Sequence, residues 1–355
     1  MKKINLLDLF SGIGGFHLGL SQAGFKVNSF YSEIDKYALK TYKHNFKNST
    51  YVGSVTDVRG AELPKINAIT FGSPCQDFSL AGNRKGMGGD RSSLILEAIR
   101  LISECRPDFF IWENVKGTFS SNNRQDFAAI LQAFANIGGY RIEWQLLNTS
   151  WFLPQNRERI YLVGCLGERS GSEVFPIGKS NIKDNKTRKI NNATRTITTA
   201  HSHGTAKHMS YIKIKEGTKK GYAEAEEGDS INYAFPESKI RRGRVGKKIA
   251  NTLDTACNQG VMVGDFRYDE GFRWRKDYNS PTLTKKSNEI LTKTKTKIRR
   301  LTPIECERLQ GFPDDWTKIG VDGPISDTQR YKMCGNAVTV DVVEKVGENL
   351  LKCLK

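Results

Sequence analysis

The chain has 355 residues, enough for one large or two moderate domains, since a domain takes roughly 150 residues. Lysine and arginine exceed aspartate and glutamate by 55 to 38, and the net charge of +17 favours a polyanionic partner such as nucleic acid over a merely solvated basic surface. The seven cysteines form no CxxC pair and no apolar run approaches the ~20 residues of a membrane span, so we expect a cytoplasmic protein with reduced thiols, no metal site and no membrane anchor.

From residue 4 to about 165, short apolar runs alternate with segments of helical period, which predicts an α/β domain with a parallel-rich, Rossmann-like sheet. Strands are expected at 4–10, 26–32, 68–71, 109–112, 141–147 and 159–163. Helices are expected at 15–23 and 36–46, and apolar residues at helical spacing predict two more near 94–102 and 127–134. This catalytic and cofactor-binding domain is placed at 1–170.

A glycine turn ends the first strand in Asp8-Leu9-Phe10-Ser11-Gly12-Ile13-Gly14-Gly15-Phe16 and opens a helix, as in nucleotide-binding folds. The third glycine of the dinucleotide fingerprint is absent, because His17 stands there. Glu33 follows about 20 residues later, where an acid can accept hydrogen bonds from both ribose hydroxyls. These features leave NAD and S-adenosylmethionine about equal, because both carry an adenosyl ribose.

Two polar residues follow buried strands. Cys75 lies in Gly72-Ser73-Pro74-Cys75-Gln76 after the run 68–71, and Glu113 lies in Trp112-Glu113-Asn114-Val115. Open α/β sheets bind ligands at the carboxyl ends of their strands. A thiolate there can add to C6 of a cytosine while an acid holds a proton at N3, which makes C5 nucleophilic enough to take a methyl group. The alternatives are a buried structural thiol and an ion-paired surface glutamate.

Two arginines lead into the strand near 160. In Gln155-Asn156-Arg157-Glu158-Arg159 the two arginines alternate, so they are expected on one face. There they can brace the exocyclic oxygen of a ring and the glutamate, or pair with surface acids.

After residue 165 the sequence is rich in Lys, Thr, Asn and Gly, which predicts a smaller, irregular, β-rich domain, placed at 171–325. A loose threonine repeat at 195–199, 251–255 and 281–284 predicts three short strands, unless it is chance. A basic run is expected to enter a DNA groove, since arginine suits guanine and phosphate; the alternative is a mobile loop with no sequence preference. Its members are Arg241, Arg242, Arg244, Lys247 and Lys248.

These segments resemble the DNA (cytosine-5)-methyltransferase family over about residues 4–165 and 299–350. The glycine turn and Ser32-Glu33-Ile34-Asp35 resemble its cofactor motifs, and Pro74-Cys75-Gln76 resembles its nucleophile motif. Glu113-Asn114-Val115 resembles its acid motif, and 155–159 its Gln-x-Arg-x-Arg motif. The segment 300–313 resembles the close of its recognition domain, and Gly335-Asn336-Ala337-Val338 its last motif, with a C-terminal helix at 326–355 that returns to the cofactor pocket.

The resemblance implies an enzyme that flips a cytosine out of a short specific sequence of double-stranded DNA and methylates C5 with S-adenosyl-L-methionine. By the same resemblance Phe10 stacks on adenine, Glu33 holds the ribose, Ile34 lines the pocket, Asn336 lies near the methionyl end and Asn114 positions the cysteine loop. The implied catalytic residues are Cys75, Glu113, Arg157 and Arg159. The implied cofactor contacts are Phe10, Gly12, Gly14, Glu33, Ile34, Ser54, Pro74, Asn336 and Val338, and Gln76 and Ser79 are expected at the DNA.

The chain departs from the family where Gly53-Ser54-Val55 stands in place of the usual Gly-Asp-Ile. Ser54, or Asp57 reaching in, would then accept the hydrogen bond from the adenine amino group. A cognate restriction endonuclease is an expected partner, and we expect a monomer.

Three other functions were weighed against this one. A tRNA cytosine methyltransferase shares the motifs but usually carries Cys-Phe-Thr, whereas Cys257 is followed by Asn258 and Gln259. A DNA-binding regulator without catalysis would not need Cys75, Glu113, Arg157 and Arg159 together. A dinucleotide-dependent oxidoreductase explains none of these four residues.

Overall fold

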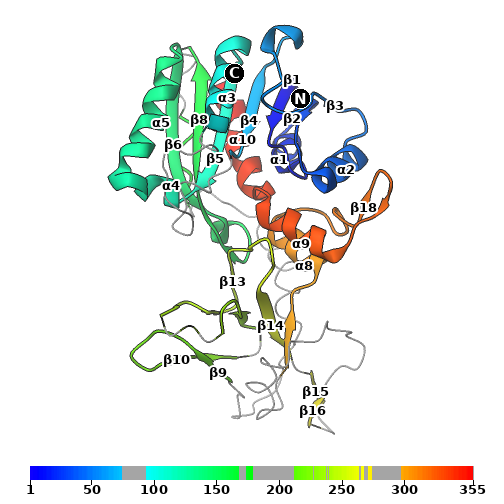
Figure 1. The fold of residues 1–355 in the computed structure, drawn as a ribbon, viewed down its shortest axis with the longest axis vertical. Coiled ribbons are helices and arrows are strands. Elements are labelled where there is room, and N and C mark those ends of the chain that lie inside the picture. Colours follow the sequence, from blue (N-terminus) through cyan, green and yellow to red (C-terminus); the bar gives the residue numbers. More distant parts are fainter. Residues whose placement is uncertain are drawn as a thin grey trace.

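The computed structural model describes residues 1–73, 93–167, 173–178, 212–226, 228–236, 238, 240–263, 265–267, 271–273 and 297–354. In Figure 1 a sheet with helices on both faces forms the upper part of the molecule, and a smaller, strand-rich part lies below it. None of the helices in these ranges is long and apolar enough to cross a membrane.

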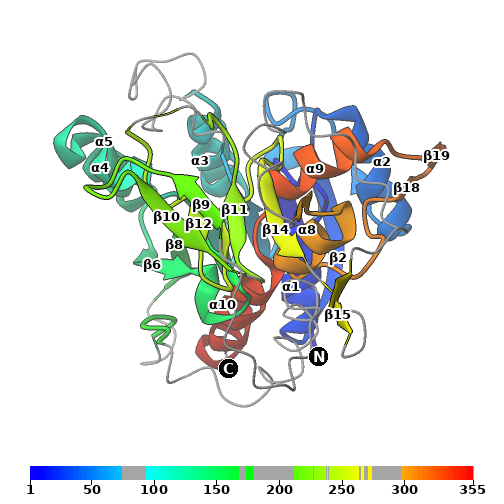
Figure 2. The ribbon, with the colours of Figure 1, turned by 90° about the horizontal axis from the view of Figure 1, so that it is seen from below.

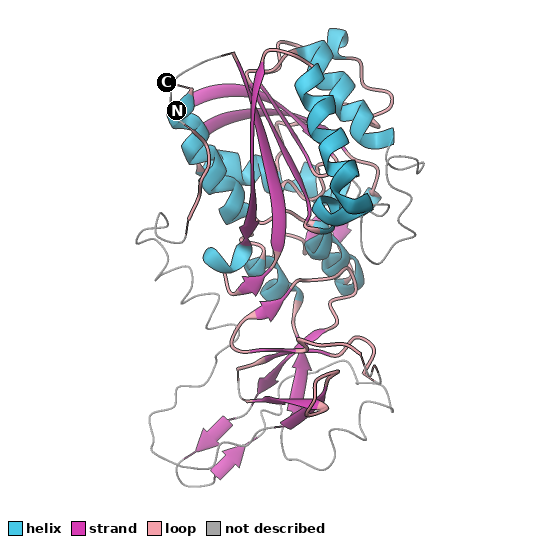
Figure 3. Ribbon diagram, turned by 90° about the vertical axis from the view of Figure 1, so that its left-hand side faces the viewer, coloured by secondary structure: helices cyan, strands magenta, loops and turns pink. Residues whose placement is uncertain are grey.

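The larger part is built on a seven-stranded sheet of order β3-β2-β1-β4-β5-β8-β6. Its strands are β1 (Lys2–Leu9), β2 (Phe25–Ser32), β3 (Thr50–Tyr51), β4 (Ala68–Phe71), β5 (Phe109–Val115), β6 (Tyr140–Asn148) and β8 (Glu158–Leu166). The first five strands in sequence are parallel, whereas β8 is antiparallel to both β5 and β6. The predicted Rossmann-like sheet is confirmed, and an antiparallel hairpin forms one edge of it (Figure 3).

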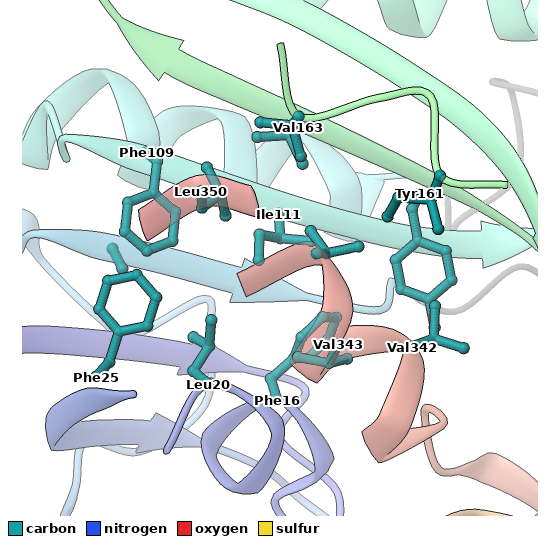
Figure 4. Close-up of a cluster of buried hydrophobic side chains, with 14 of the residues drawn as sticks. Phe16, Leu20, Phe25, Phe109, Ile111, Tyr161, Val163, Val342, Val343 and Leu350 are labelled. Carbon is teal, nitrogen blue, oxygen red and sulfur yellow. The ribbon is translucent and has the colours of Figure 1, made fainter. Parts of the chain in front are cut away.

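Helices cover both faces because successive side chains of each strand point to opposite sides. On one face, Phe109 and Ile111 of β5 pack with α1 (Gly15–Gln22) and α10 (Val340–Cys353), as Figure 4 shows. On the other face, Phe110 and Trp112 pack with α3 (Ser93–Cys105) and α5 (Gln125–Asn136). The two remaining helices near the sheet are α2 (Lys36–Asn45) and the short α4 (Gly117–Ser120).

The last helix, α10, packs on the larger part; one helix was expected over 326–355, whereas α10 begins at Val340. Val343, Val346 and Leu350 of α10 are buried against α1. The approach is close at Gly19, where a Cβ would lie 2.6 Å from the Cβ of Val343, so a side chain larger than hydrogen would separate the helices. Helices from opposite ends of the sequence, α1 and α10, therefore share one hydrophobic core.

The smaller part is strand-rich, as predicted. Its main sheet has the order β12-β11-β14-β17, and Figure 2 shows it from below. Its strands are β9 (Ile212–Lys215), β10 (Tyr222–Ala225), β11 (Ser230–Asn232), β12 (Val245–Gly246), β13 (Ala250–Asn251), β14 (Gln259–Val263), β15 (Asp265–Arg267), β16 (Gly271–Arg273) and β17 (Lys297–Arg300). Of the threonine repeat, 195–199 and 281–284 lie outside the described residues, and at 251–255 only Asn251 is in a strand.

Two segments expected in the smaller domain, 173–178 and 303–325, contact the larger part. In the first segment, Val174, Phe175 and Ile177 belong to the core of the larger part. At the other end, 303–325 contacts both parts: Cys306 and Leu309 pack with Leu253 and Val261 of the smaller part, and Trp316 Nε1 donates to the Ile13 carbonyl at 3.0 Å. This end contains α8 (Pro303–Leu309), β18 (Ile319–Gly320) and β19 (Gly323–Pro324), and α9 (Asp327–Asn336) follows. The described strands of the smaller part lie between Ile212 and Arg300.

Candidate active site

The end of β4 is fixed to the end of β5 through one serine. Ser73 Oγ accepts hydrogen bonds from Trp112 Nε1 at 3.1 Å and from Asn114 Nδ2 at 3.3 Å, and all three side chains are buried. Asn114 Oδ1 in turn accepts from the Val115 amide and from Thr118 Oγ1. The chain that leads to Pro74 and Cys75 therefore leaves the sheet from a rigid point beside Glu113.

Four of the predicted site residues, Pro74, Cys75, Gln76 and Ser79, lie outside the described residues. The structure does show the surroundings of Gly72, just before this segment. A Cβ at Gly72 would lie 3.3 Å from Glu113 Oε2, so the glutamate carboxyl adjoins the backbone three residues before Cys75.

Glu113 lies in β5 and is 8% exposed. Its Oε1 is 3.2 Å from Arg159 Nε, and within the described part of the chain this buried oxygen makes no hydrogen bond. A buried carboxylate oxygen costs free energy unless it gains a donor. The carboxyl is thus oriented by a cation and still has room for one donor or for a proton.

The two arginines of the Gln-x-Arg-x-Arg segment have different surroundings. Arg159 faces Glu113, whereas Arg157 is 3% exposed and donates to the carbonyls of Gly335 at 3.3 Å and Ala337 at 2.8 Å. These carbonyls flank Asn336. The structure therefore separates the predicted pair: Arg159 belongs with the glutamate, and Arg157 holds the turn that carries Asn336.

The glycine turn and the end of β2 form a second half of the site. Glu33 Oε2 accepts from the Gly12 amide at 2.8 Å, and Oε1 accepts from the amides of Ile34 at 2.7 Å and Asp35 at 2.8 Å. Phe10 has a φ of +51°, a left-handed conformation that is strained for a phenylalanine and typical of functional turns. Three backbone donors thus hold a carboxylate in place at the carboxyl ends of the strands.

The side chains around this carboxylate suit an adenosyl group. Ile34 is 79% exposed, an unusual position for an apolar side chain, and Asn336 is also exposed. Val338 lies against the glycine turn, where a Cβ at Gly15 would lie 2.6 Å from its Cγ2. A carboxylate acceptor beside exposed apolar groups fits a ribose diol and an adenine ring, so the residues present fit S-adenosylmethionine.

Two further predicted cofactor residues have defined surroundings. Gly14 has a φ of +85° and begins α1, and a Cβ there would overlap the ring of Phe46. Ser54 is partly buried, and its Oγ lies 3.0 Å from Thr56 Oγ1. The Ser54 hydroxyl can therefore exchange this bond for another.

A buried polar cluster lies beneath the glycine turn. Asp8 is fully buried and accepts from Thr70 Oγ1 at 2.8 Å and from Tyr42 OH at 3.4 Å. Burial raises the pKa of Asp8 to about 8. His17, whose Nδ1 is 3.1 Å from Tyr42 OH, is also buried, and burial lowers its pKa to about 4. Both groups are therefore uncharged at neutral pH.

These two pKa values predict a pH dependence of stability. The raised pKa of Asp8 gives a contribution that is complete below about pH 4 and is lost as the pH rises through 8. The lowered pKa of His17 gives a contribution that is present above about pH 6.5 and is lost as the pH falls through 4. The two oppose each other between pH 4 and 6.5, and Asp8 alone acts between 6.5 and 8.

We expect the free energy of unfolding of the native protein to fall by about 2 kcal/mol more than that of Asp8→Asn between pH 6.5 and 8, since one pKa unit is worth about 1.4 kcal/mol. Urea unfolding of both proteins at several pH values measures this. Parallel pH curves would show that Asp8 does not carry a raised pKa.

The basic run of the smaller domain is divided between exposed and buried side chains. Arg241 is exposed and its guanidinium stacks 4.4 Å from the centre of the Phe235 ring, and Arg242 and Lys248 are exposed as well. Lys247 pairs with Asp229 at 2.8 Å. All four side chains are exposed, but the Lys247 ammonium is held by Asp229 and Arg242 Nε donates to the Gly217 carbonyl at 2.8 Å.

Arg244 differs from the rest of the run. It is 4% exposed and donates to main-chain carbonyls of four residues, Lys215, Asn232, Ala234 and Pro236. A guanidinium enclosed in this way does not reach a phosphate or a base. Arg244 was expected at the DNA, and in the structure it holds the loop between β11 and β12 together.

Sequence reasoning missed several residues that organise the site. Asp8 was quoted only as part of the glycine turn, although a charged residue inside a buried strand is itself a signal of a polar cluster. Gln155 was quoted only as part of the Gln-x-Arg-x-Arg motif, although its side chain is completely buried. Ser73 was noted only as a departure from the family, and its hydrogen bonds depend on contacts that sequence does not reveal.

The chain is similar to known proteins over almost its whole length. The family model described as C-5 cytosine-specific DNA methylase matches residues 4–352. The type II methyltransferase M.Bsp6I from Bacillus sp. is 30% identical over 367 residues, covering 99% of each chain. M1.ScrFI from Lactococcus lactis is 32% identical over 99% of this chain and 79% of its own, and the orphan methyltransferase M.SPRI of Bacillus phage SPR is 27% identical over 99% of this chain and 98% of its own.

Solved structures share the fold. The methyltransferase EhMeth of Entamoeba histolytica superposes with a TM-score of 0.63 at 18% identity, over 100% of both chains. The Dnmt2 methyltransferase of S. pombe gives a TM-score of 0.62 at 17% identity, over 99% of both chains.

Proposed function

The chain belongs to the C-5 cytosine-specific DNA methylase family and is a DNA (cytosine-5)-methyltransferase, and we propose that it acts through a covalent adduct between Cys75 and C6 of a flipped-out cytosine. The observation that carries this mechanism is Glu113: a buried carboxyl, oriented by Arg159, with an oxygen that lacks a hydrogen bond within the described residues. The N3 position of a cytosine supplies the missing partner.

The chemistry divides among three side chains. The Cys75 thiolate adds to C6 while Glu113 donates a proton to N3 or shares one with it, so electron density moves to C5. Arg159 keeps the carboxyl aimed at the ring and stabilises its charge once the proton is transferred. After C5 has been alkylated, a base removes the C5 proton, the C5–C6 double bond re-forms and the thiolate leaves.

S-adenosyl-L-methionine, when bound, supplies the electrophilic methyl group. Glu33 would accept hydrogen bonds from its ribose hydroxyls, and Phe10 and Ile34 would cover the adenine. Ser54, where the family usually carries an acid, would accept from the adenine amino group. Asn336, held by Arg157 through the two carbonyls beside it, would lie at the methionyl end.

The smaller domain would hold double-stranded DNA and select the site. Arg241, Arg242, Lys247 and Lys248 would contact phosphates or base edges, and Gln76 and Ser79 would contact DNA from the catalytic side. Flipping is needed because C6 is inaccessible inside the base stack. We propose that the enzyme is a monomer and that methylation protects DNA from an endonuclease that cuts the same sequence, since several relatives are type II methyltransferases.

Duplex DNA containing 5-fluorocytosine tests the adduct, because fluorine at C5 cannot leave as a proton does. We expect the purified protein to form a denaturation-resistant complex with this DNA only when S-adenosylmethionine is present, and the attached peptide to contain Cys75. Methyl transfer to ordinary DNA without any such complex would reject the covalent mechanism.

A further inference from the structure

One of the contacts between the two domains is a buried side-chain amide. Gln155, in the two-residue strand β7 (Gln155–Asn156), is 0% exposed. Its Nε2 donates to the Leu309 carbonyl at 2.8 Å, and its Oε1 accepts from the Leu253 amide at 3.1 Å. Leu309 lies in α8, through which the chain re-enters the catalytic domain, and Leu253 lies in the base of the smaller domain. The Gln155 side chain thus bonds both to the base of the smaller domain and to the helix by which the chain returns to the catalytic domain.

The backbone beside Gln155 makes a second connection. β7 pairs in parallel with β13 of the smaller domain, with Gln155 opposite Ala250. Thr252 Oγ1 donates to the Asn156 carbonyl at 2.7 Å. Figure 1 shows β13 where the two parts of the molecule meet. The smaller domain therefore contacts β7, which directly precedes Arg157 and Arg159 in the chain.

The turn that carries Asn336 contacts the same loop. A Cβ at Gly335 would lie 2.6 Å from the Asp254 carbonyl oxygen, so the turn is packed between the loop at 252–255 and Arg157. Going along the motif, Gln155 contacts the smaller domain, Arg157 contacts the cofactor turn and Arg159 contacts Glu113. Small displacements at Gln155 would reach both of the other sites.

We propose that Gln155 is a positioning residue, which fixes the smaller domain on the catalytic sheet so that DNA held by that domain meets Glu113 and Arg159 in register. The proposal rests on the function proposed above. A reacting group misplaced by about 1 Å can lose about 100-fold in rate. A looser contact between the smaller domain and β7 would therefore lower kcat, while the DNA-binding and cofactor-binding surfaces stay intact.

Gln155→Met removes both hydrogen bonds and keeps the shape. Its matched control is Gln259→Met, because Gln259 is equally buried and its Nε2 donates to the carbonyls of Asn251 and Thr252, both within the smaller domain. Each variant loses a buried amide that bonds to the segment 251–253, but only Gln155→Met loses a bond between that segment and the catalytic domain.

The distance between nitroxide labels, carried by non-natural amino acids at the exposed Lys26 and Lys220, reports the domain arrangement without any methylation assay. We expect a narrow distribution in the native protein and in Gln259→Met, and one about twofold broader in Gln155→Met. An unchanged width in Gln155→Met overturns the proposal, whether or not the protein methylates DNA. If the native protein shows no methylation while the width responds, the proposed function fails and the positioning role stands.

Kinetics give a second readout. We expect Gln155→Met to lower kcat about tenfold, with dissociation constants for S-adenosylmethionine and DNA within about twofold of native. Gln155→Glu covers the case in which the methionine variant does not fold, because a protonated glutamic acid can still donate to Leu309 and accept from Leu253. Its kcat relative to native should rise as the pH falls from 8 to 6, and a flat ratio would contradict the positioning role.

Discussion

Glu113→Gln is expected to lower kcat by about 100-fold or more, because proton transfer by a positioned side chain is worth roughly 10²–10⁴ in rate. The amide keeps the shape but has no acidic proton to give to N3, and it loses the ion pair with Arg159 Nε at 3.2 Å. Single-turnover methyl transfer from labelled cofactor to cognate duplex DNA measures the effect. Binding of both substrates should stay close to native.

The control for this substitution is Glu158→Gln. Glu158 is a neighbouring carboxyl that pairs with Lys116 at 2.9 Å on the surface, and such pairs contribute little. We expect its kcat to lie within about twofold of native. A Glu113→Gln enzyme as fast as this control would remove Glu113 from the mechanism.

Arg157→Met is expected to weaken S-adenosylmethionine binding by at least about tenfold. The substitution leaves the Gly335 and Ala337 carbonyls without their guanidinium donor, and buried carbonyls that lose a partner cost about 1–3 kcal/mol. The turn between them carries Asn336, so the cost falls on the cofactor pocket. Calorimetric titration of the purified variant measures the dissociation constant.

Arg159→Met is the matched variant, because it removes the same group two residues later. We expect it to bind the cofactor as the native protein does and to lose kcat, since its guanidinium pairs with Glu113. The opposite outcome, with Arg157→Met losing only kcat, would restore the shared catalytic role that the alternation of the two arginines predicted.

Much of the larger domain is predictable from its sequence. Apolar runs and helical spacing predict most of its strands and helices, although β3 and α4 were not expected. The strands β5 and β8 extend three residues past their predicted ends, to Val115 and Leu166. A parallel-rich sheet was predicted, but the antiparallel direction of β8 was not, because buried parallel and antiparallel strands share the same apolar pattern. The short connection from Asn148 to Glu158 was the available signal for an antiparallel hairpin.

The sequence predicted which residues form the site better than it predicted their contacts. Glu113 and Arg159 are close together as expected, because both belong to neighbouring strands of one sheet. The burial of Arg157 and Arg244 was not predicted, because whether an arginine is exposed depends on carbonyls brought from distant segments, such as Ala337 for Arg157 and Lys215 for Arg244. Charge and spacing along the chain carry no record of those carbonyls.

Bisulfite sequencing of plasmid DNA from a methylation-free bacterial host tests the central claim most directly, with the native chain and its Cys75→Ser variant expressed side by side. We predict that cytosines become protected within one recurring short sequence in the native sample and stay unprotected with the variant. Unprotected DNA from a host that makes folded, cofactor-binding native protein would contradict DNA methylation, and tRNA would be the next substrate to test.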